Sequence, residues 1–554
     1  PGFALTADNA AAIVELCRRL DGLPLALELA AARLSLLTPQ ALLTRMRQRL
    51  PMLTRGARDL PQRQQTLRNT LAWSYDLLDE REQRLFRRLA VFVGGFPLEA
   101  VASVWTDEES SPSSEEEEGE DDVVELVAQL LDKSLIQPTD TVDGEPRFRM
   151  LQTIREYALE RLSASGEEQA VKRRHADFYL RLAETAEPHL LHPERDAWLS
   201  RLERAHDNLR AALAWSSSEH GAAQTGLRLA GALSWFWYQR GYLREGRTFL
   251  EALLARGEQA DGSAARGKAL SGASLLAWAQ GDIEVAGEQA EESVALFRAL
   301  GDPSWIAGAL VILGSIQVSQ GKLEAARASL EESKSLFQEQ DLTSFGAFVV
   351  YHLGRAAFAS HDMLEANTLY QQSLALFREV GDQLGEAMAL TALGVVAAAQ
   401  GDAVTAQSLL NQSLPLMRAT GDRRDLTQSL LTAGTVRLEQ GDLQQAHNLF
   451  TESLRLWDSI GGQENAAGIR HALTGLAEVA AAQGRAERAG RLLGAAKALS
   501  PLPANFFSEA SSIDLDQDIA QARAHLDQAP FEAGWAAGQA MTQEQAISYA
   551  LLDD

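Results

Sequence analysis

The chain has 554 residues, of which 46% are hydrophobic and 23% charged, as in proteins that bury a large core. This length corresponds to about three or four domains. Asp and Glu number 76 against 51 Lys and Arg, which gives a formal net charge of −25. That balance argues against a nucleic-acid or anionic membrane surface, because both need clustered cations. The single cysteine, Cys17, excludes an internal disulfide and a cysteine-rich zinc site.

We expect a soluble, cytoplasmic protein with no membrane span, because the apolar stretches are shorter than a bilayer-spanning helix requires. We also expect no signal peptide. The chain opens with Pro1 rather than Met, so we expect it to begin inside a longer protein.

Residues 1–60 are predicted to form a small helical subdomain. A helix at Ala12–Leu20 runs into a turn containing Gly22, Leu23 and Pro24, and a second helix follows at Leu25–Leu34. Proline suits a first helical position because its missing N–H has no partner there. The string CRRLDGLPLALELAA resembles the GxP motif of the STAND ATPases, which include the NB-ARC proteins. The resemblance implies that Gly22, Leu23 and Pro24 follow a P-loop core and that Pro24 packs on the adenine of ADP or ATP.

Residues 61–165 are patterned as a winged helix. The predicted elements are helices at Leu71–Leu78, Arg81–Phe92 and Val123–Lys133, and strands at Leu135–Gln137 and Arg147–Met150 around an Asp143-Gly144 turn. This order resembles the winged-helix domain that follows the GxP helices in the same family, where it locks the closed, ADP-bound state. The family's Met-His-Asp motif would fall near Met150. Leu151 and Gln152 stand at its last two positions, and leucine cannot donate a hydrogen bond to phosphate.

The acidic residues are concentrated in one run. Asp107–Asp122 carries ten acidic side chains in sixteen residues, and such a run repels itself. We therefore expect a disordered acidic loop over 107–122. Because no cluster of Lys and Arg offsets it, a DNA-binding role for the winged helix is disfavoured.

A forty-residue period dominates the rest of the chain. Turn residues recur at Gly241, Gly281, Gly321, His361, Gly401 and Gly441, and halfway between them at Gly301, Asp341, Gly381, Gly421 and Gly461. The segments between the turns have the helical three- and four-residue apolar spacing. Small residues lie seven before each turn, and alanine lies five after it, at Ala286, Ala326, Ala366, Ala406 and Ala446. This pattern resembles the tetratricopeptide repeat and is not expected of HEAT or armadillo repeats.

The predicted fold is therefore mostly α. A connector at 166–220 leads into an α-solenoid of about six to seven helix hairpins over 221–500, and a helical cap follows at 501–554. Solenoids of this kind present a concave binding surface. Aromatic residues and an arginine fall on helices expected to face it: Trp235, Tyr238, Trp278, Tyr351, Arg355 and Phe358. We expect these residues to bind a protein or peptide, with core packing as the alternative for each.

No enzymatic site is found in the sequence. The strings GSAARGKA at 262–269 and GYLREGRT at 241–248 come nearest to a phosphate-binding loop. The first lacks the Ser or Thr that would hold magnesium, and the second has Arg247 in place of lysine. We expect no ATP hydrolysis by this chain alone, and expect Mg²⁺ to be held upstream. His189 and His192, near Glu187 and Glu194, are read as exposed polar residues rather than metal ligands.

The resemblance implies the regulatory and sensory part of a STAND-type protein, in which ligand binding to the repeats permits nucleotide exchange and drives self-oligomerisation. The output is expected to be transcriptional regulation or defence signalling. The alternative is a tetratricopeptide scaffold without a nucleotide switch, which would not need the adenine-packing Pro24. A DNA-binding winged-helix activator would need a basic recognition helix, which the sequence does not show.

Overall fold

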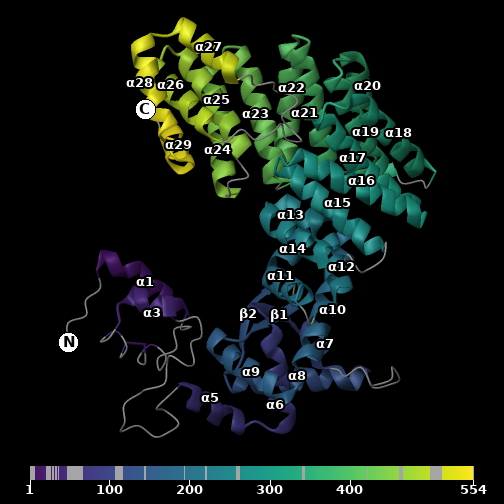
Figure 1. The fold of residues 1–554 in the computed structure, drawn as a ribbon, viewed down its shortest axis with the longest axis vertical. Coiled ribbons are helices and arrows are strands. Elements are labelled where there is room, and N and C mark those ends of the chain that lie inside the picture. The colour runs from purple at the N-terminus through teal and green to yellow at the C-terminus, as the bar shows by residue number, and fades with distance from the viewer. Residues whose placement is uncertain are drawn as a thin grey trace. The chain divides into compact units, whose positions relative to one another are not determined.

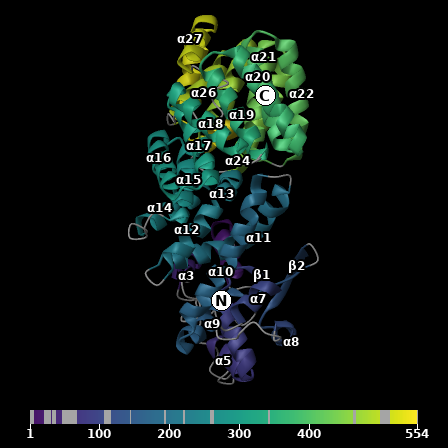
Figure 2. The same cartoon turned by 90° about the vertical axis from the view of Figure 1, so that its right-hand side faces the viewer.

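The computed structural model describes residues 6–19, 27, 30–31, 34, 37–45, 67–105, 116–142, 145–191, 194–218, 221–256, 263–339, 343–420, 422–460, 466–499 and 515–552. Its elements are almost all helices (Figures 1 and 2). The chain divides into two compact units, one formed by residues 1–182 and 201–226 and the other by residues 183–200 and 227–554. None of the described helices is both long and apolar enough to cross a bilayer.

The first unit contains the winged-helix region. Its elements are α1 (Ala7–Arg19), α3 (Pro39–Arg45), α5 (Leu67–Asp76), α6 (Glu80–Arg88), η2 (Leu89–Val91), β1 (Gly95–Pro97), α7 (Leu98–Trp105), α8 (Glu116–Asp132), β2 (Gln137–Val142), β3 (Glu145–Arg149) and α9 (Gln152–Ser165). Helix α10 (Glu168–Ala186), η3 (Glu187–Leu191), α11 (Arg195–Ser216) and α12 (Ala223–Ala232) follow, and the divisions between the units fall within α10, α11 and α12.

Local signals explain where these elements begin. Helix α6 starts with a capping box, in which Asp79 Oδ1 accepts from Glu82 N at 2.8 Å and Glu82 Oε2 accepts from Asp79 N at 2.9 Å. The predicted hairpin is present as β2 and β3. A third strand, β1, completes an antiparallel sheet of order β1-β3-β2, with Phe96 opposite Phe148. The sequence analysis missed β1 and α7.

The acidic loop was predicted wrongly in its second half. Residues 116–122 belong to the first two turns of α8 instead of to a disordered segment, and residues 107–115 lie outside the described residues. Acidic residues are favourable at a helix N-terminus because they complement the helix dipole. Asp122 also pairs with Arg81 at 2.6 Å.

The second unit is a stack of helix hairpins, as predicted. After α12 (Ala223–Ala232), α13 (Ser234–Arg240) and α14 (Leu243–Arg256), each hairpin has an A helix and a B helix. The pairs are α15 (Ala264–Ala279) with α16 (Ile283–Leu300), α17 (Pro303–Ser319) with α18 (Leu323–Gln338), α19 (Thr343–Ala359) with α20 (Met363–Val380), α21 (Gln383–Ala399) with α22 (Ala403–Ala419), α23 (Arg423–Glu439) with α24 (Leu443–Ile460) and α25 (Ala466–Ala482) with α26 (Ala486–Ala498).

The predicted register of the repeats is confirmed. Gly281, Gly321, Gly401 and Gly441 have φ between +73° and +83°, and His361 takes the same left-handed conformation with φ of 60°. Ala326, Ala366 and Ala406 are fully buried. Of the second series of turns, Asp341, Gly421 and Gly461 lie outside the described residues.

A buried serine hydrogen bond repeats with the same period. In five B helices a fully buried serine Oγ donates to the backbone carbonyl of the residue 26 positions earlier, on the paired A helix. The pairs are Ser293 with Gly267, Ser333 with Ala307, Ser373 with Ala347, Ser413 with Ala387 and Ser453 with Thr427. The distances are 2.8 to 3.1 Å. This bond fixes each B helix on its A helix, and the sequence analysis did not identify it.

Three helices close the carboxyl end: α27 (Leu515–His525), α28 (Gln528–Gln539) and α29 (Gln543–Ala550). Helix α28 lies directly against α26, and glycines form the contact on both sides. A Cβ on Gly490 would lie 2.2 Å from the Phe531 carbonyl oxygen, and one on Gly538 would lie 2.0 Å from that of Arg491. The two backbones therefore touch without intervening side chains.

Candidate functional site

The second unit contains a cavity of about 470 Å³. Its lining comes from η3, from the start of α11, from α12 and α13, and from the A helices α15, α17, α19, α21 and α23. On α17 the lining includes Trp305, Gly308, Ile312 and Ser315. Residues at this three- and four-residue spacing share one face of a helix. One face of each successive A helix thus contributes to the wall.

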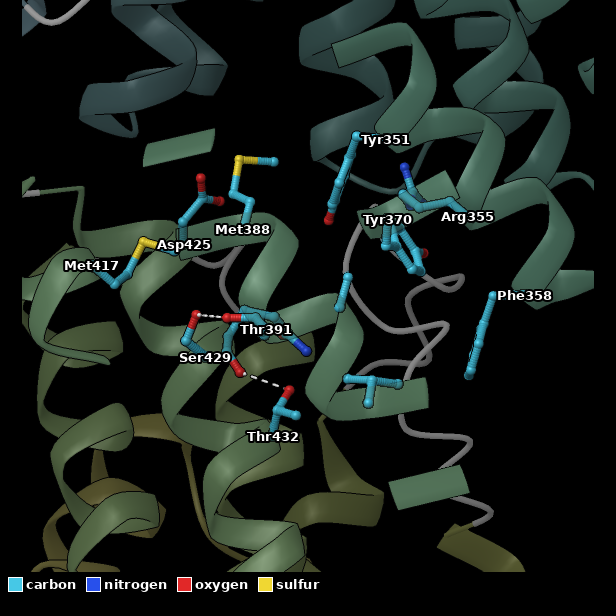
Figure 3. Close-up of a pocket in the computed structure, with 13 residues that line it drawn as sticks. Tyr351, Arg355, Phe358, Tyr370, Met388, Thr391, Met417, Asp425, Ser429 and Thr432 are labelled. Carbon is cyan, nitrogen blue, oxygen red and sulfur yellow. Dashed lines mark hydrogen bonds between the residues drawn. The ribbon is translucent and has the colours of Figure 1, made fainter. Parts of the chain in front are cut away.

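The six predicted binding residues all line this cavity or a smaller one beside it. Trp235, Tyr238 and Trp278 line the larger cavity. The other three, Tyr351, Arg355 and Phe358, line the smaller cavity of about 60 Å³. Figure 3 shows these three on one side of the smaller cavity, with Met417 and Asp425 on the other.

The two cavities share part of their lining. Met388 and Asp425 contribute to both. At the floor of the smaller cavity the Thr391 Oγ1 lies 3.2 Å from the Ser429 Oγ (Figure 3). The sequence-predicted residues are therefore brought together around one connected region of the second unit.

The six predicted binding residues include side chains that are more buried than an exposed concave surface would allow. Trp278 is 1% exposed, Arg355 5% and Tyr351 7%. The Trp278 indole N–H donates to the Ser319 Oγ at 3.0 Å, and the Arg355 guanidinium lies 5.9 Å from the Trp278 ring centre. These contacts bridge neighbouring A helices, which is why the side chains are covered. The residues both pack in the core and line a cavity.

Sequence reasoning missed several wall residues. Trp305 and Phe345 occupy the same position in successive repeats, forty residues apart, and Phe348 lies one turn beyond Phe345. Each is partly exposed to the cavity side. The forty-residue period was the signal that could have identified Trp305 and Phe345, since it places the two aromatic residues at equivalent positions of successive A helices.

At one position in the cavity wall, a glycine leaves space for a larger side chain. A Cβ built on Gly308 would meet no atom within 4 Å, although Gly308 lines the cavity. Gly346 on α19 is equally unobstructed but does not line the cavity. The two positions therefore allow the cavity to be filled in one variant and left open in its matched control.

A buried polar group lies between the A helices α17 and α19. His352 Nδ1 is 3.0 Å from the Ser315 Oγ and 3.3 Å from Arg355 Nη1. Burial, and then the positive charge of Arg355, hold the pKa of His352 well below its usual range. His352 is therefore neutral at physiological pH and available for hydrogen bonding rather than for charge pairing.

Charged residues of η3, α11 and α15 also line the cavity. The Lys268 ammonium donates to Glu187 Oε2 at 2.8 Å and lies 4.1 Å from the Trp305 ring centre. Both side chains are mostly buried, with 19% of Lys268 and 23% of Glu187 exposed. Arg195, at the start of α11, also lines the cavity.

The segment that carries Glu187 is held on the second unit by two further contacts. Gln239 Nε2 donates to the Leu190 carbonyl at 3.3 Å, and Arg228 makes a two-pronged pair with Glu184 at 2.7 and 2.8 Å. Glu187 and Leu190 belong to η3, a 3-10 helix that lies between α10 and α11 in the chain. Part of the cavity wall is thus the link between those two helices.

The same two helices supply the support of the winged-helix sheet in the first unit. Asn208 Oδ1 on α11 accepts from Val93 N at 2.7 Å, and its Nδ2 donates to the Gly95 carbonyl at 3.0 Å. His175 on α10 lies 3.3 Å from the same Oδ1. Burial lowers the pKa of His175 to about 4, so this ring is neutral. Helices α10 and α11 therefore support β1 within the first unit. The η3 segment between them lines the cavity within the second unit.

The remaining sequence-predicted sites lie elsewhere. Gly22, Leu23 and Pro24 lie outside the described residues, as does His192. His189 pairs with Glu194 at 3.1 Å and stacks on Trp198 at 5.1 Å. Among the described residues there is no group of three or more His, Cys, Asp or Glu able to hold a metal ion.

Two domain families match the chain. Residues 78–163 match a winged helix-turn-helix domain, and residues 347–419 and 396–459 match a tetratricopeptide repeat. The chain carries a winged helix followed by tetratricopeptide repeats. Both assignments agree with the order of elements described above.

Longer relatives share parts of the chain. A Mycobacterium bovis protein named as a candidate HTH-type transcriptional regulator is 39% identical over 321 residues, which cover 57% of this chain and 35% of that protein. An uncharacterised Mycobacterium tuberculosis protein is 40% identical over 173 residues, which cover 31% of this chain and 42% of that protein. The matched region thus spans about a third to two fifths of the length of these relatives.

A solved structure shares the fold. It is a signal transduction ATPase with numerous domains (STAND) that has a tetratricopeptide repeat sensor, from Pyrococcus horikoshii. The match has a TM-score of 0.50 and 15% identity and covers 95% of this chain and 74% of that chain. At this identity the likeness concerns the fold alone.

Proposed function

We propose that the chain is the sensory and regulatory part of a signal-transduction protein, in which the repeats bind an effector and the winged-helix unit responds. The observation that carries the proposal is the aromatic-lined cavity of about 470 Å³. This volume lies within the range of about 300–1,000 Å³ typical of small-molecule sites. The fold shared with a STAND protein and the mycobacterial regulator relative support the regulatory role.

The burial of the wall residues bears on the size of the effector. A folded protein partner would need exposed anchors, whereas Trp278 and Tyr351 are covered by neighbouring helices. A small molecule or a few residues of a peptide fits the space. The effector is therefore proposed to lie within the cavity of the repeats instead of across their outer surface.

The winged helix is proposed to act as a coupling domain instead of as a DNA reader. Helix α8 carries eight acidic residues and no basic residue in its 17 positions. A helix of that charge is repelled by phosphates. Nucleotide-dependent coupling through Gly22, Leu23 and Pro24, together with self-oligomerisation, forms part of the proposal and rests on the sequence resemblance.

A plain scaffold is the alternative. It would bind partners on exposed faces and would not need a cavity whose wall includes the link between α10 and α11. Occupancy of the cavity and a response in the first unit are thus the two properties that separate a sensor from a scaffold.

Binding of a neutral apolar dye tests the cavity directly. N-phenyl-naphthylamine should bind the full chain in a 1:1 complex with enhanced fluorescence. Gly308→Leu fills the cavity and should weaken binding by about tenfold or more, while Gly346→Leu should bind as the parent does. The amides of the Val93–Pro97 segment should change their hydrogen-exchange rate when the dye is bound.

Two results would contradict the proposal. Dye binding that Gly308→Leu leaves unchanged would place the site elsewhere. Dye binding that leaves hydrogen exchange over the first unit unaltered would favour the scaffold. Circular dichroism of both variants serves as the control for folding, because leucine is a better helix former than glycine at these open positions.

A further inference from the structure

Three charged residues line the part of the cavity formed by η3, α11 and α15: Glu187, Arg195 and Lys268. Arg195 is 8% exposed, and its nearby carboxylate, Asp196 at 3.5 Å, has a side chain that is 57% exposed. Glu187 is bonded to Lys268 at 2.8 Å. This part of the wall therefore holds two cations against one mostly buried carboxylate.

A mostly buried ammonium needs a hydrogen-bonded acceptor, because an uncompensated charge in an apolar wall is costly. Glu187 supplies that acceptor. It belongs to η3, whereas Lys268 and Trp305 belong to the A helices α15 and α17. An acidic group on a bound molecule would offer Lys268 the same bond. Glu187 thus occupies the position that a ligand's acidic group would take.

We infer that the cavity binds an amphipathic organic anion, whose apolar body lies against Trp278, Trp305 and Phe348 and whose acidic group takes Lys268 from Glu187. This inference rests on the proposed function, since it names the ligand class of the same cavity. Asp422, which caps the N-terminus of α23, and Asp425 on α23 also line the cavity and repel an anionic group. The acidic group of the ligand is therefore directed to Lys268.

Displacement of Glu187 from Lys268 lets ligand binding affect residues outside the cavity. Glu187 is the first residue of η3, the link between α10 and α11. When Glu187 loses Lys268, the Gln239–Leu190 contact of η3 and the Arg228–Glu184 pair of the neighbouring α10 remain. A ligand without an acidic group fills the cavity and leaves this link in place. Only a ligand with an acidic group therefore releases Glu187 and changes the contacts of η3.

Matched fluorescent probes test the inference on the full chain. Dansyl-undecanoic acid and its methyl ester share a fluorophore and an alkyl chain and differ in charge, and dansylcadaverine carries the same fluorophore on a shorter chain that ends in a cation. The acid should bind about tenfold or more tightly than the ester, and dansylcadaverine should bind no better than the ester. Lys268→Met keeps the aliphatic stem and removes the charge. It should lower the affinity for the acid to that for the ester and leave the ester unchanged, while Lys268→Arg should retain the preference for the acid.

The Glu187→Gln variant distinguishes a Lys268 that binds the ligand from a Lys268 that has only a structural role. Because it weakens the internal competitor, the variant should bind the acid several-fold more tightly than the parent chain. In the parent chain the acid, and not the ester, should speed hydrogen exchange of the amides of residues 187–191.

Equal affinity for acid and ester, or a preference for dansylcadaverine, would overturn the inference. The proposed function would survive that result if N-phenyl-naphthylamine still bound in a manner sensitive to Gly308→Leu. Failure of all the probes, including the neutral dye, would overturn both. A preference for the acid that persists in Lys268→Met would also overturn the inference, because another cation would then hold the ligand.

Discussion

In the repeats, glycines of the A helices face large side chains of the B helices, whereas at the carboxyl end glycines face another backbone. A Cβ on Gly314 would lie 2.7 Å from Leu330 Cγ, and one on Gly354 would lie 2.8 Å from the Tyr370 ring. A Cβ on Gly534 or Gly538 would instead lie 2.1 or 2.0 Å from a main-chain oxygen of α26. A side chain can rotate away from a new methyl group, but a helical carbonyl cannot. The same residue type therefore has very different tolerance in the two regions.

The carboxyl-terminal contact should be the most sensitive position in the second unit. Gly538→Ala forces α28 away from α26 and separates apolar residues such as Phe531 from the core. We expect a loss of more than about 3 kcal/mol in the free energy of unfolding, at the upper end of overpacking effects. Thermal unfolding followed by circular dichroism measures it. Gly346→Ala, at an open helical position, is the control, and equal melting temperatures for the two variants would contradict the close contact.

Helix α25, which packs against the carboxyl-terminal helices α27 and α29, should respond to pH through a buried carboxyl group. Burial first, and then the charges of Asp518 and Glu439, raise the pKa of Glu478 from 4.5 to about 7. The folded chain holds this proton more tightly than the unfolded chain does. The resulting stability is fully present below pH 4.5 and is lost as the pH rises through 7.

Glu478→Gln removes this pH dependence. Above pH 7 the variant should be more stable than the parent chain, by up to the order of 3 kcal/mol, from about 1.4 kcal/mol per pKa unit. At pH 4 the two should unfold alike. Urea denaturation across this pH range measures both. A variant that is no more stable at alkaline pH would show that the carboxylate is solvated there.

The helix contacts within the repeats could be predicted from the sequence, whereas the contact at the carboxyl end could not. The repeats were predicted because Gly314 and Ala326 recur every forty residues, so the contact partners can be found by period alone. The contact between α26 and α28 has no repeat to reveal it, and Gly494 and Gly538 were not singled out. Strand β1 was missed for a similar reason. It is three residues long and pairs with β3, about fifty residues later in the chain.

For the cavity, the sequence predicted some of the lining residues but not how they pack against one another. Trp278 and Tyr351 were identified as binding residues because aromatic side chains on A helices are visible in the sequence. Core packing was the alternative for each of them, and the sequence does not decide between the two because the outcome depends on how neighbouring repeats pack. The Lys268–Glu187 pair joins residues 81 positions apart, one of them outside the repeats, and no local pattern indicates it.

Within the repeats, filling a glycine should have a moderate effect. Gly314→Ala places a methyl group 2.7 Å from Leu330 Cγ, and the leucine can give way in part. Alanine also favours the helix by about 1 kcal/mol relative to glycine. We expect a net loss of roughly 1–2 kcal/mol by urea denaturation. A stabilising outcome, like that expected for Gly346→Ala, would mean that α17 and α18 do not approach closely at this point.

The smallest expected effect concerns the repeated serine bond, and helix α18 offers a matched pair to measure it. Ser333 is fully buried and its Oγ donates to the Ala307 carbonyl of the paired helix at 2.8 Å. Ser335, two residues further on, is exposed and its Oγ donates to the Glu331 carbonyl of its own helix at 3.1 Å. Ser333→Ala should cost about 1 kcal/mol, because a buried bond between helices is lost. Ser335→Ala should change the stability by less than about 0.5 kcal/mol, as surface substitutions do. If both variants unfolded at the same urea concentration, the period-forty serine would be a consequence of the repeat and not one of the bonds that hold its helices together.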